Sequence, residues 1–213
     1  MGYGSYQNDV VFVESGETFF YALDGDDIIY GHDGMEYLSG DNGDDFVDGG
    51  GGDDIIYGGF DPVYGGNDEL DGASGNDQIF GQMGDDTLIG GVGDDTLYGG
   101  AGDDTLTGSD PSLWNSGSGE YDVLTGGSGA DTFVLGDSFE AYYQGNGYVT
   151  ITDFEWAEGD IFRVHGSMSD YSLAHSSTFA RTSIYYQNDL IALVENTTSQ
   201  NDVMLEYDFQ FVA

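Results

Sequence analysis

Residues 90–107 read GGVGDDTLYGGAGDDTLT, which is two consecutive nonapeptides of one template, G-G-x-G-x-D-x-U-x, with U a large apolar residue. Glycines at positions one, two and four let the backbone adopt positive φ angles and bring carbonyl groups close together. Position six supplies a carboxylate, and positions seven to nine form a short strand whose middle side chain points inward. The template therefore predicts a glycine turn and a strand that recur every nine residues.

The same frame extends over residues 4–134 as thirteen repeats. Position eight is apolar in all thirteen, and position six is Asp in eleven, with Thr18 and Glu36 as the exceptions. The repeats at 58–71 and 108–125 carry five and nine extra residues before the Asp, in the turn, where a loop can lengthen without breaking a strand. Reading 108–125 as two nonapeptides instead places Asn115 at the inward apolar position, so a lengthened turn is favoured.

One nonapeptide cannot bury its apolar side chain alone, but two of them form an 18-residue coil, and stacked coils bury a continuous core. The predicted fold class is therefore all-β, a parallel β-roll (a β-solenoid) over residues 1–134. At a strand spacing of about 4.8 Å, thirteen repeats make about six coils and a rod about 30 Å long.

Residues 135–213 are predicted to form a C-terminal β-rich region that caps the last coil and covers its strand edges. Apolar and β-branched runs alternate there with Gly, Ser, Asn and Asp. The predicted strands are Tyr148–Phe154, Ile161–His165, Thr182–Tyr186, Leu190–Val194 and Val203–Phe209.

Alternate repeats lie on opposite sides of the roll, so the position-six residues sort into two columns. The first column contains Asp9, Asp27, Asp45, Asp68, Asp86, Asp104 and Asp131. The second column contains Thr18, Glu36, Asp54, Asp77, Asp95 and Asp122. Backbone carbonyls of the turns are expected to add oxygens near Gly49, Gly52, Gly81, Gly84, Gly90, Gly93, Gly99, Gly102, Gly126 and Gly129.

Sites built from six or more hard oxygen atoms suit Ca²⁺ rather than Zn²⁺ or Cu²⁺, and Mg²⁺ demands a tighter octahedron. The predicted cofactor is therefore calcium, at roughly eight to ten ions. The chain has no cysteine, and its three histidines, His32, His165 and His175, are scattered without metal-ligand spacing.

The charge balance also favours a cation-binding chain. The sequence contains 41 Asp and Glu residues but only 2 Lys and Arg residues, which gives a net charge of −39. Such self-repulsion opposes compaction, disfavours nucleic acid and anionic membranes as partners, and favours multivalent cations. We expect the metal-free chain to be largely disordered and its folding to depend on calcium. The acidic residues at position five are expected to face solvent; they are Asp26, Asp44, Asp53, Asp85, Asp94 and Asp103.

Catalysis is not predicted, because the chain contains no HExxH, no G-x-S-x-G, no Cys nucleophile and no phosphate loop. Carboxylates at this spacing are interpreted as metal ligands rather than as a glycosidase pair. Residues 1–20 lack a cleavable secretory signal, and no apolar run is long enough for membrane insertion.

Residues 22–134 closely resemble the hemolysin-type (RTX) repeat family, whose fold is a parallel β-roll with Ca²⁺ between turns. Gly126–Leu135 resembles the usual last coil, and ITDF at 151–154 followed by GDIF at 159–162 resembles the family's C-terminal closing segment. Asp189–Val194 and Phe209–Ala213 look like cyanobacterial members. The resemblance implies an uncleaved C-terminal signal for the type I secretion machinery and an extracellular or cell-surface location.

The leading functional hypothesis is a secreted calcium-binding roll that acts as a structural and secretion module. A second hypothesis is a calcium-dependent filament, matrix or surface-layer component, a homo-oligomer formed through the uncapped N-terminal coil. Six aromatic residues gather there: Tyr3, Tyr6, Phe12, Phe19, Phe20 and Tyr21. A third is a C-terminal fragment of a larger secreted toxin or hydrolase.

Overall fold

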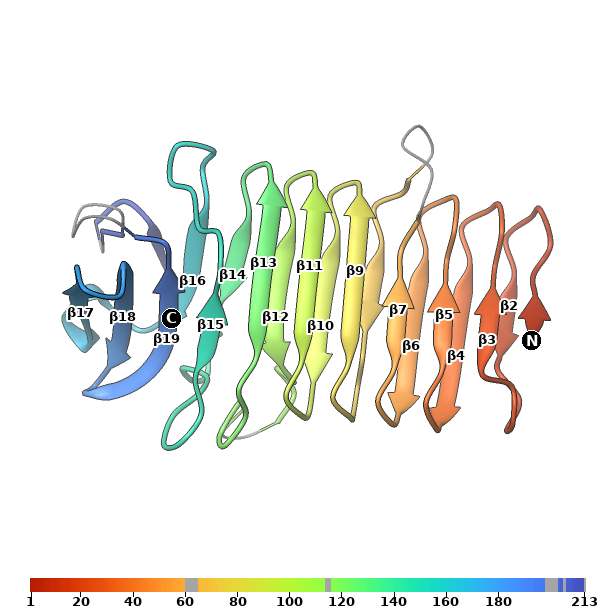
Figure 1. Cartoon of the computed structure of the whole chain (residues 1–213), viewed down its shortest axis with the longest axis horizontal. Helices are drawn as coiled ribbons and strands as arrows, with labels where there is room; N and C mark the ends of the chain where they lie inside the picture. The colour runs from red at the N-terminus through yellow and green to blue at the C-terminus, as the bar shows by residue number, and fades with distance from the viewer. Residues whose placement is uncertain (60–64, 114–115, 198–202, 205, 213) are drawn as a thin grey trace.

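The chain forms a long, flattened roll in which short strands stack along one axis and the two termini lie at opposite ends (Figure 1). The structure is a computed structural model, and it describes residues 1–59, 65–113, 116–197, 203–204 and 206–212. Within these ranges the only regular element besides strands is a 3₁₀ turn at Met168–Asp170. None of the described segments is a helix long and apolar enough to span a membrane. The predicted all-β parallel β-roll is confirmed.

Two sheets make up the described part of the roll, one of eleven strands and one of nine. The larger sheet contains, in spatial order, β1 (Gly2–Tyr3), β3 (Phe19–Tyr21), β5 (Tyr37–Ser39), β7 (Ile55–Tyr57), β9 (Gln78–Met83), β11 (Thr96–Ala101), β13 (Val123–Ser128), β15 (Val149–Ile151), β19 (Asp189–Glu195), β18 (Arg181–Tyr186) and β17 (Tyr171–Ser176). The smaller sheet contains β2 (Val10–Phe12), β4 (Ile28–Asp33), β6 (Phe46–Gly51), β8 (Glu69–Asp71), β10 (Thr87–Gly91), β12 (Thr105–Ser109), β14 (Thr132–Val134), β16 (Ile161–His165) and β20 (Phe209–Val212).

The register places each position-eight residue over its equivalent in the next coil. Leu88 pairs with Leu106, and the insertions leave this register intact, since Val47 pairs with Leu70 and Leu97 with Leu124. Both insertions are therefore absorbed in turns, as predicted. Asn115, on which the alternative reading of 108–125 depended, lies outside the described residues.

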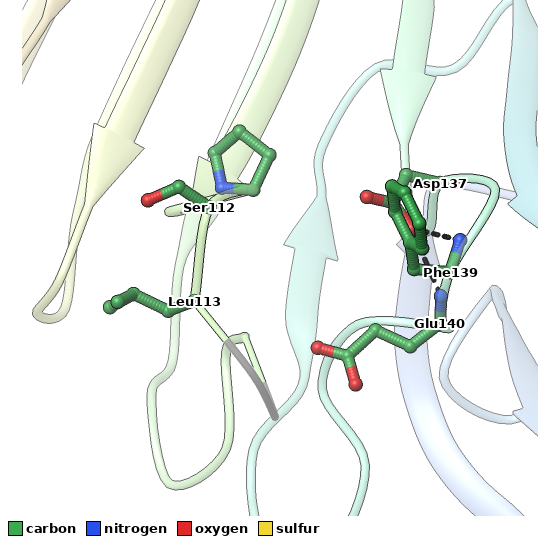
Figure 2. A pocket seen from close by; sticks show the side chains of 6 residues that line it. Ser112, Leu113, Asp137, Phe139 and Glu140 are labelled. Atoms are coloured by element: carbon green, nitrogen blue, oxygen red, sulfur yellow. Dashed lines mark hydrogen bonds between the residues drawn. The ribbon is translucent and has the colours of Figure 1, made fainter.

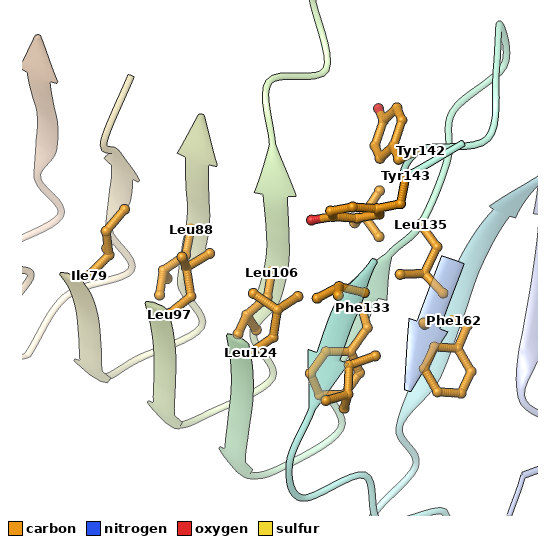
Figure 3. Close-up of a cluster of buried hydrophobic side chains, with 14 of the residues drawn as sticks. Ile79, Leu88, Leu97, Leu106, Leu124, Phe133, Leu135, Tyr142, Tyr143 and Phe162 are labelled. Atoms are coloured by element: carbon orange, nitrogen blue, oxygen red, sulfur yellow. The ribbon is translucent and has the colours of Figure 1, made fainter. Parts of the chain in front are cut away.

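The core is one row of inward side chains from each sheet, which face each other along the roll (Figure 3). Position-eight side chains from Ile29 to Phe133 are completely buried, Phe20 is nearly so, and Val11 at the N-terminal end is partly buried. Full burial of a Leu or Ile side chain stabilises a fold by about 1.5–3 kcal/mol. This core holds the coils in register, and the register in turn stacks their glycine turns.

The C-terminal region continues both sheets before closing them. β15 and β16 pair in parallel with β13 and β14, and β19 then pairs in parallel with β15. β18 pairs antiparallel with β19, and β17 pairs antiparallel with β18. In the smaller sheet, β20 pairs in parallel with β16. The proposed division at residue 134 stays a prediction.

Four of the five strands predicted in this region occur, with ends within three residues of the predicted ones. The prediction of a strand at Val203–Phe209 is wrong, because the strand begins at Phe209; residue 205 lies outside the described residues. β17 was not predicted, since its sequence YSLAHS lacks a clear apolar alternation.

Candidate metal centre

The position-six carboxylates form two continuous hydrogen-bonded ladders, one on each side of the roll. In each step, a carboxylate Oδ1 accepts the backbone N–H of the position-six residue in the preceding coil. The donor–acceptor distances are 2.6–2.9 Å in the first ladder, from Asp9 to Asp131, and 2.7–2.8 Å in the second, from Glu36 to Asp122. The position-six N–H precedes the strand, so this carboxylate satisfies a donor that the sheet leaves free.

The second oxygen of the interior ladder carboxylates has no hydrogen-bond partner and is shielded from solvent. This holds, among the described residues, for Oδ2 of Asp27, Asp45, Asp68, Asp86 and Asp104 in the first ladder and of Asp54, Asp77 and Asp95 in the second. These side chains are at most 3% exposed. A buried carboxylate oxygen without a donor or a cation is costly, so eight in register mark a row of cation sites.

Backbone carbonyls lie beside these oxygens. A Cβ atom at Gly49 would lie 2.8 Å from Oδ2 of Asp54 and 3.0 Å from the carbonyl oxygen of Gly72, the position-one glycine of the next coil in the same column. The pattern recurs in successive repeats, with the carbonyls of Gly81, Gly90, Gly99 and Gly126 beside the carboxylates of Asp68, Asp77, Asp86 and Asp104. In these repeats, glycine at position one leaves this space open, because a side chain there would fill it.

Position-four carbonyls lie elsewhere in the turn. The carbonyl oxygen of Gly75 faces Gly93 of the next coil, whose φ is 144°, and the carbonyl oxygen of Gly84 faces Gly102 in the same way. A Cβ atom at a position-four glycine therefore meets a different carbonyl from one at position one, and the expected carbonyl ligands at position four stay a prediction.

No three His, Cys, Asp or Glu side chains of the described residues converge into a metal-binding group. One ladder carboxylate and one turn carbonyl recur at each level instead. An ion in this arrangement draws on main-chain oxygens for much of its coordination, which suits a hard cation with many oxygen ligands.

The metal-free ladders have strongly perturbed acidities. Burial raises the pKa of Asp54, Asp68 and Asp95 to about 8, and repulsion from neighbouring carboxylates adds to the effect, against the opposing hydrogen bond from a backbone N–H. Burial likewise raises the pKa of Asp45, Asp77 and Asp104 to about 7. A carboxylate in this position requires either a proton or a cation near neutral pH.

The N-terminal ends of the ladders differ from their interiors. Oδ2 of Asp9 accepts the backbone N–H of Ser5 at 2.6 Å. Glu36, which replaces Asp at the start of the second ladder, accepts the backbone N–H of His32 at 3.2 Å and lies 3.1 Å from its Nδ1. Donors from the chain thus contact one oxygen of each carboxylate, and Oε1 of Glu36 is buried without a hydrogen-bond partner.

At the C-terminal ends of the ladders, two residues, Asp160 and Tyr143, have roles that the sequence interpretation missed. The first ladder continues to Asp160, whose Oδ1 accepts the N–H of Asp131 at 2.9 Å and whose Oδ2 accepts the N–H of Glu155 at 2.7 Å. Asp160 could have been found from its D-I-F sequence at 160–162, which fits the D-x-U part of the template. The second ladder ends at Asp122, whose Oδ2 accepts a hydrogen bond from the Tyr143 hydroxyl.

The position-five acidic residues are exposed, as expected, but they also bind the backbone. Their Oδ1 accepts the N–H of the following coil, so Asp44 accepts from Asn67 at 2.8 Å and Asp94 accepts from Tyr121 at 2.8 Å. These bonds run in the opposite direction to those of position six. Where position five is Asp, two opposed carboxylate–amide bonds therefore join neighbouring coils.

One shallow pocket of about 280 Å³ lies away from the ladders, between the 108–125 insertion and the loop after β14 (Figure 2). Pro111, Leu113 and Phe139 form its apolar wall, and Asp137 and Glu140 are its acidic residues. The Asp137 carboxylate accepts the N–H groups of Phe139 and Glu140 at 2.7 and 3.0 Å, so it stabilises its own turn.

Comparison with known proteins agrees with the repeat geometry. The family model of the RTX calcium-binding nonapeptide repeat matches residues 3–34, 30–61, 64–97, 80–110 and 116–138, which together exceed half of the chain. No curated protein sequence matches the chain.

Two solved structures are among those similar to the chain. The AlgE6R3 subunit of the Azotobacter vinelandii mannuronan C5-epimerase is 23% identical with a TM-score of 0.27, over 70% of this chain and 81% of that one. The extracellular lipase LipA from Serratia marcescens is 18% identical with a TM-score of 0.24, over 94% of this chain and 40% of that one. On its family-model match, the chain belongs to the RTX calcium-binding nonapeptide repeat family.

Proposed function

We propose that this chain is a calcium-binding structural module of a secreted protein, which folds when it binds several calcium ions outside the cell. The observation that supports this most is the row of eight buried carboxylate oxygens without hydrogen-bond partners, five in the first ladder and three in the second. Bound calcium would supply positive charge at each level.

The proposed ligands are the ladder carboxylates with the position-one carbonyls of the next coil. The eight interior carboxylates with an unpartnered oxygen support a proposed number of roughly eight to ten ions. The end carboxylates Asp9, Glu36 and Asp122 are proposed as weaker ligands, because hydrogen-bond donors of the chain already contact them. Asp131 makes the same two ladder hydrogen bonds as the interior residues of its ladder, and it is retained as a proposed ligand.

Calcium-dependent folding follows from charge. Metal-free coils place buried carboxylates of like charge in adjacent levels, in a chain of net charge −39. A site at tenfold excess of free calcium over its dissociation constant contributes about 1.4 kcal/mol, so eight sites together match the stability of an ordinary domain of about 5–15 kcal/mol. Such a chain stays unfolded where calcium is scarce, which is compatible with passage through a type I secretion channel.

Calcium titration of the purified full chain tests the proposal. Circular dichroism should change from a disordered spectrum in chelator to a β-sheet spectrum in millimolar calcium, and calorimetry should count several ions. A full β-sheet spectrum in excess chelator would overturn calcium-dependent folding, and absence of calcium binding would overturn the module's function.

A second candidate function is calcium-dependent self-assembly. The apolar side chains of the first coil are largely exposed in the structure, with Tyr3 at 61%, Val10 at 63% and Phe12 at 71%. Apolar strand edges of this kind favour pairing with another copy. Light scattering measures the mass of the protein in calcium and in chelator. A protein that stays monomeric at all concentrations in calcium contradicts assembly.

A further inference from the structure

Glu120 is the exception to the pattern of buried oxygens. Ten side-chain oxygens in the described part of the chain are buried without a hydrogen-bond partner, and nine of them belong to position-six residues of the ladders. The tenth is Oε2 of Glu120, which occupies position four, where the template has glycine. The repeat pattern does not explain this carboxylate.

The position of Glu120 in the coil places its carboxylate at one end of the second ladder. Its repeat stacks on the repeat of Asp95 through the pairing of Val123 with Thr96. Two hydrogen bonds join these repeats directly beside it, from Asp95 N–H to Asp122 Oδ1 and from Tyr121 N–H to Asp94 Oδ1, both 2.8 Å.

The side chain of Glu120 reaches across this interface. Backbone groups of Gly93, the position-four residue of the Asp95 repeat, and of Gly117 are close enough to its carboxylate to favour the charged form. Burial raises the pKa of Glu120 to about 7, and repulsion from Asp122 and Asp94 adds to it. Glu120 is in turn among the charges that raise the pKa of Asp95.

Two further oxygens adjoin the same interface. Oδ2 of Asp95 is buried without a partner, and a Cβ atom at Gly90 would meet both this oxygen and the carbonyl oxygen of Gly108. Asp122 cannot contribute its Oδ2 in the same way, because that oxygen accepts the Tyr143 hydroxyl. At the last level of the second ladder, Oδ2 of Asp95 and Oε2 of Glu120 are thus both buried without a hydrogen-bond partner, and a turn carbonyl lies beside the Asp95 oxygen.

We propose that Glu120 is a side-chain calcium ligand at the last level of the second ladder, together with Asp95 and the Gly108 carbonyl. The inference rests on the proposed calcium-binding function and adds a ligand outside the nonapeptide template. Calcium affinity rises with the number of charged ligands, so this level binds calcium more tightly than levels with a single unpartnered carboxylate oxygen.

Glu158 provides a matched control. It stands at position four of the last repeat of the first ladder, two residues before Asp160, and its carboxylate accepts the N–H of Gly129 at 3.4 Å. The side chain of Glu158 is exposed, in contrast to the partly buried Glu120. It shares sequence position and charge with Glu120 but has no buried free oxygen.

Calorimetric calcium titration of the full chain tests the proposal with Glu120→Gln and Glu158→Gln. Glu120→Gln should weaken one site by about tenfold or more and leave the other sites unchanged, whereas Glu158→Gln should titrate like the unchanged chain. Equal titrations of Glu120→Gln and the unchanged chain would overturn the role of Glu120 while leaving the calcium-binding function intact. Failure of the unchanged chain to bind calcium would instead overturn the proposed function.

A terbium measurement keeps the test independent of folding yield. Tb³⁺ replaces Ca²⁺ at oxygen sites, and a nearby tyrosine sensitises the luminescence of the bound Tb³⁺. The tyrosine here is Tyr143, whose hydroxyl is hydrogen-bonded to Asp122. Glu120→Asp keeps the charge, and should retain more of the tightest terbium signal than Glu120→Gln. Equal loss in both variants would show that the residue acts through packing and would overturn the proposal.

Discussion

The Tyr143 hydroxyl donates a hydrogen bond to Oδ2 of Asp122, the carboxylate oxygen that has no partner in Asp54, Asp77 and Asp95. A Cβ atom at Gly108 would meet this hydroxyl and the Asp122 carboxylate, whereas one at Gly90 would meet a backbone carbonyl and the Asp95 carboxylate. The hydroxyl therefore stands where the next coil would place its carbonyl, and it ends the second ladder with a hydrogen bond.

Tyr143→Phe should destabilise the calcium-loaded protein by about 1–3 kcal/mol, because it leaves a buried carboxylate oxygen of Asp122 without a donor. Thermal unfolding in excess calcium measures the effect. Tyr142→Phe is the control, since Tyr142 is also buried but its hydroxyl makes no hydrogen bond to the described residues. An unchanged melting temperature for Tyr143→Phe would contradict the capping role.

Asp77→Asn should have opposite effects with and without calcium. Asn keeps an oxygen that can accept the N–H of Asp54 but removes a buried charge, so the variant should need about tenfold more calcium to fold. In chelator it should be no less ordered than the unchanged chain, because repulsion within the ladder falls. Circular dichroism against calcium concentration gives both results.

Asp53→Asn removes the same charge from an exposed side chain of the neighbouring repeat, whose Oδ1 accepts the N–H of Asn76 at 2.9 Å. Its calcium midpoint should stay close to that of the unchanged chain. Equal shifts for Asp53→Asn and Asp77→Asn would mean that overall charge, and not the ladder position, governs folding.

The metal-free chain should gain β-structure as the pH falls from about 8 to about 5. The folded pKa values of Asp54, Asp68 and Asp95 are about 8, whereas unfolded carboxylates titrate near 4. The folded state therefore binds more protons, and the stability that these groups contribute is complete below about pH 4 and is lost as the pH rises through about 8. Circular dichroism of calcium-stripped protein tests this, and a spectrum independent of pH would contradict it.

Gly93→Ala should separate the coils of the second ladder. Gly93 has a φ of 144°, and a Cβ atom there would collide with the carbonyl oxygen of Gly75 in the preceding coil. Gly119→Ala is the matched control, since Gly119 has a φ of 87° but open space around its Cα. Denaturant unfolding in calcium should show a loss for Gly93→Ala well above the ~1 kcal/mol expected for Gly119→Ala.

The periodic part of the fold was predictable because each repeat contains the residues that determine its own local structure. The nine-residue template specifies a glycine turn, a carboxylate and an inward apolar side chain, and stacking follows from the need to bury residues such as Leu97. The two columns follow from the alternation of sides, and the Asp95 to Asp122 step shows that the long turn between them does not alter the pairing.

The irregular features could not be predicted in this way, because they depend on contacts between segments without a common period. Val149, and not an acidic residue, occupies the position after Asp122 in the second ladder, as the pairing of Val123 with Thr150 shows. Tyr143 approaches from the loop before β15, and its contact with Asp122 has no sequence signal.

The sequence by itself determined the coil, the inward core and the two rows of acidic residues, since these depend on spacing along the chain. Only the tertiary structure decided which carboxylate oxygens are left without donors. That outcome depends on which backbone N–H or hydroxyl reaches each carboxylate across the stacked coils. The same packing buries Oε2 of Glu120 and leaves Glu158, at the equivalent position, exposed to solvent.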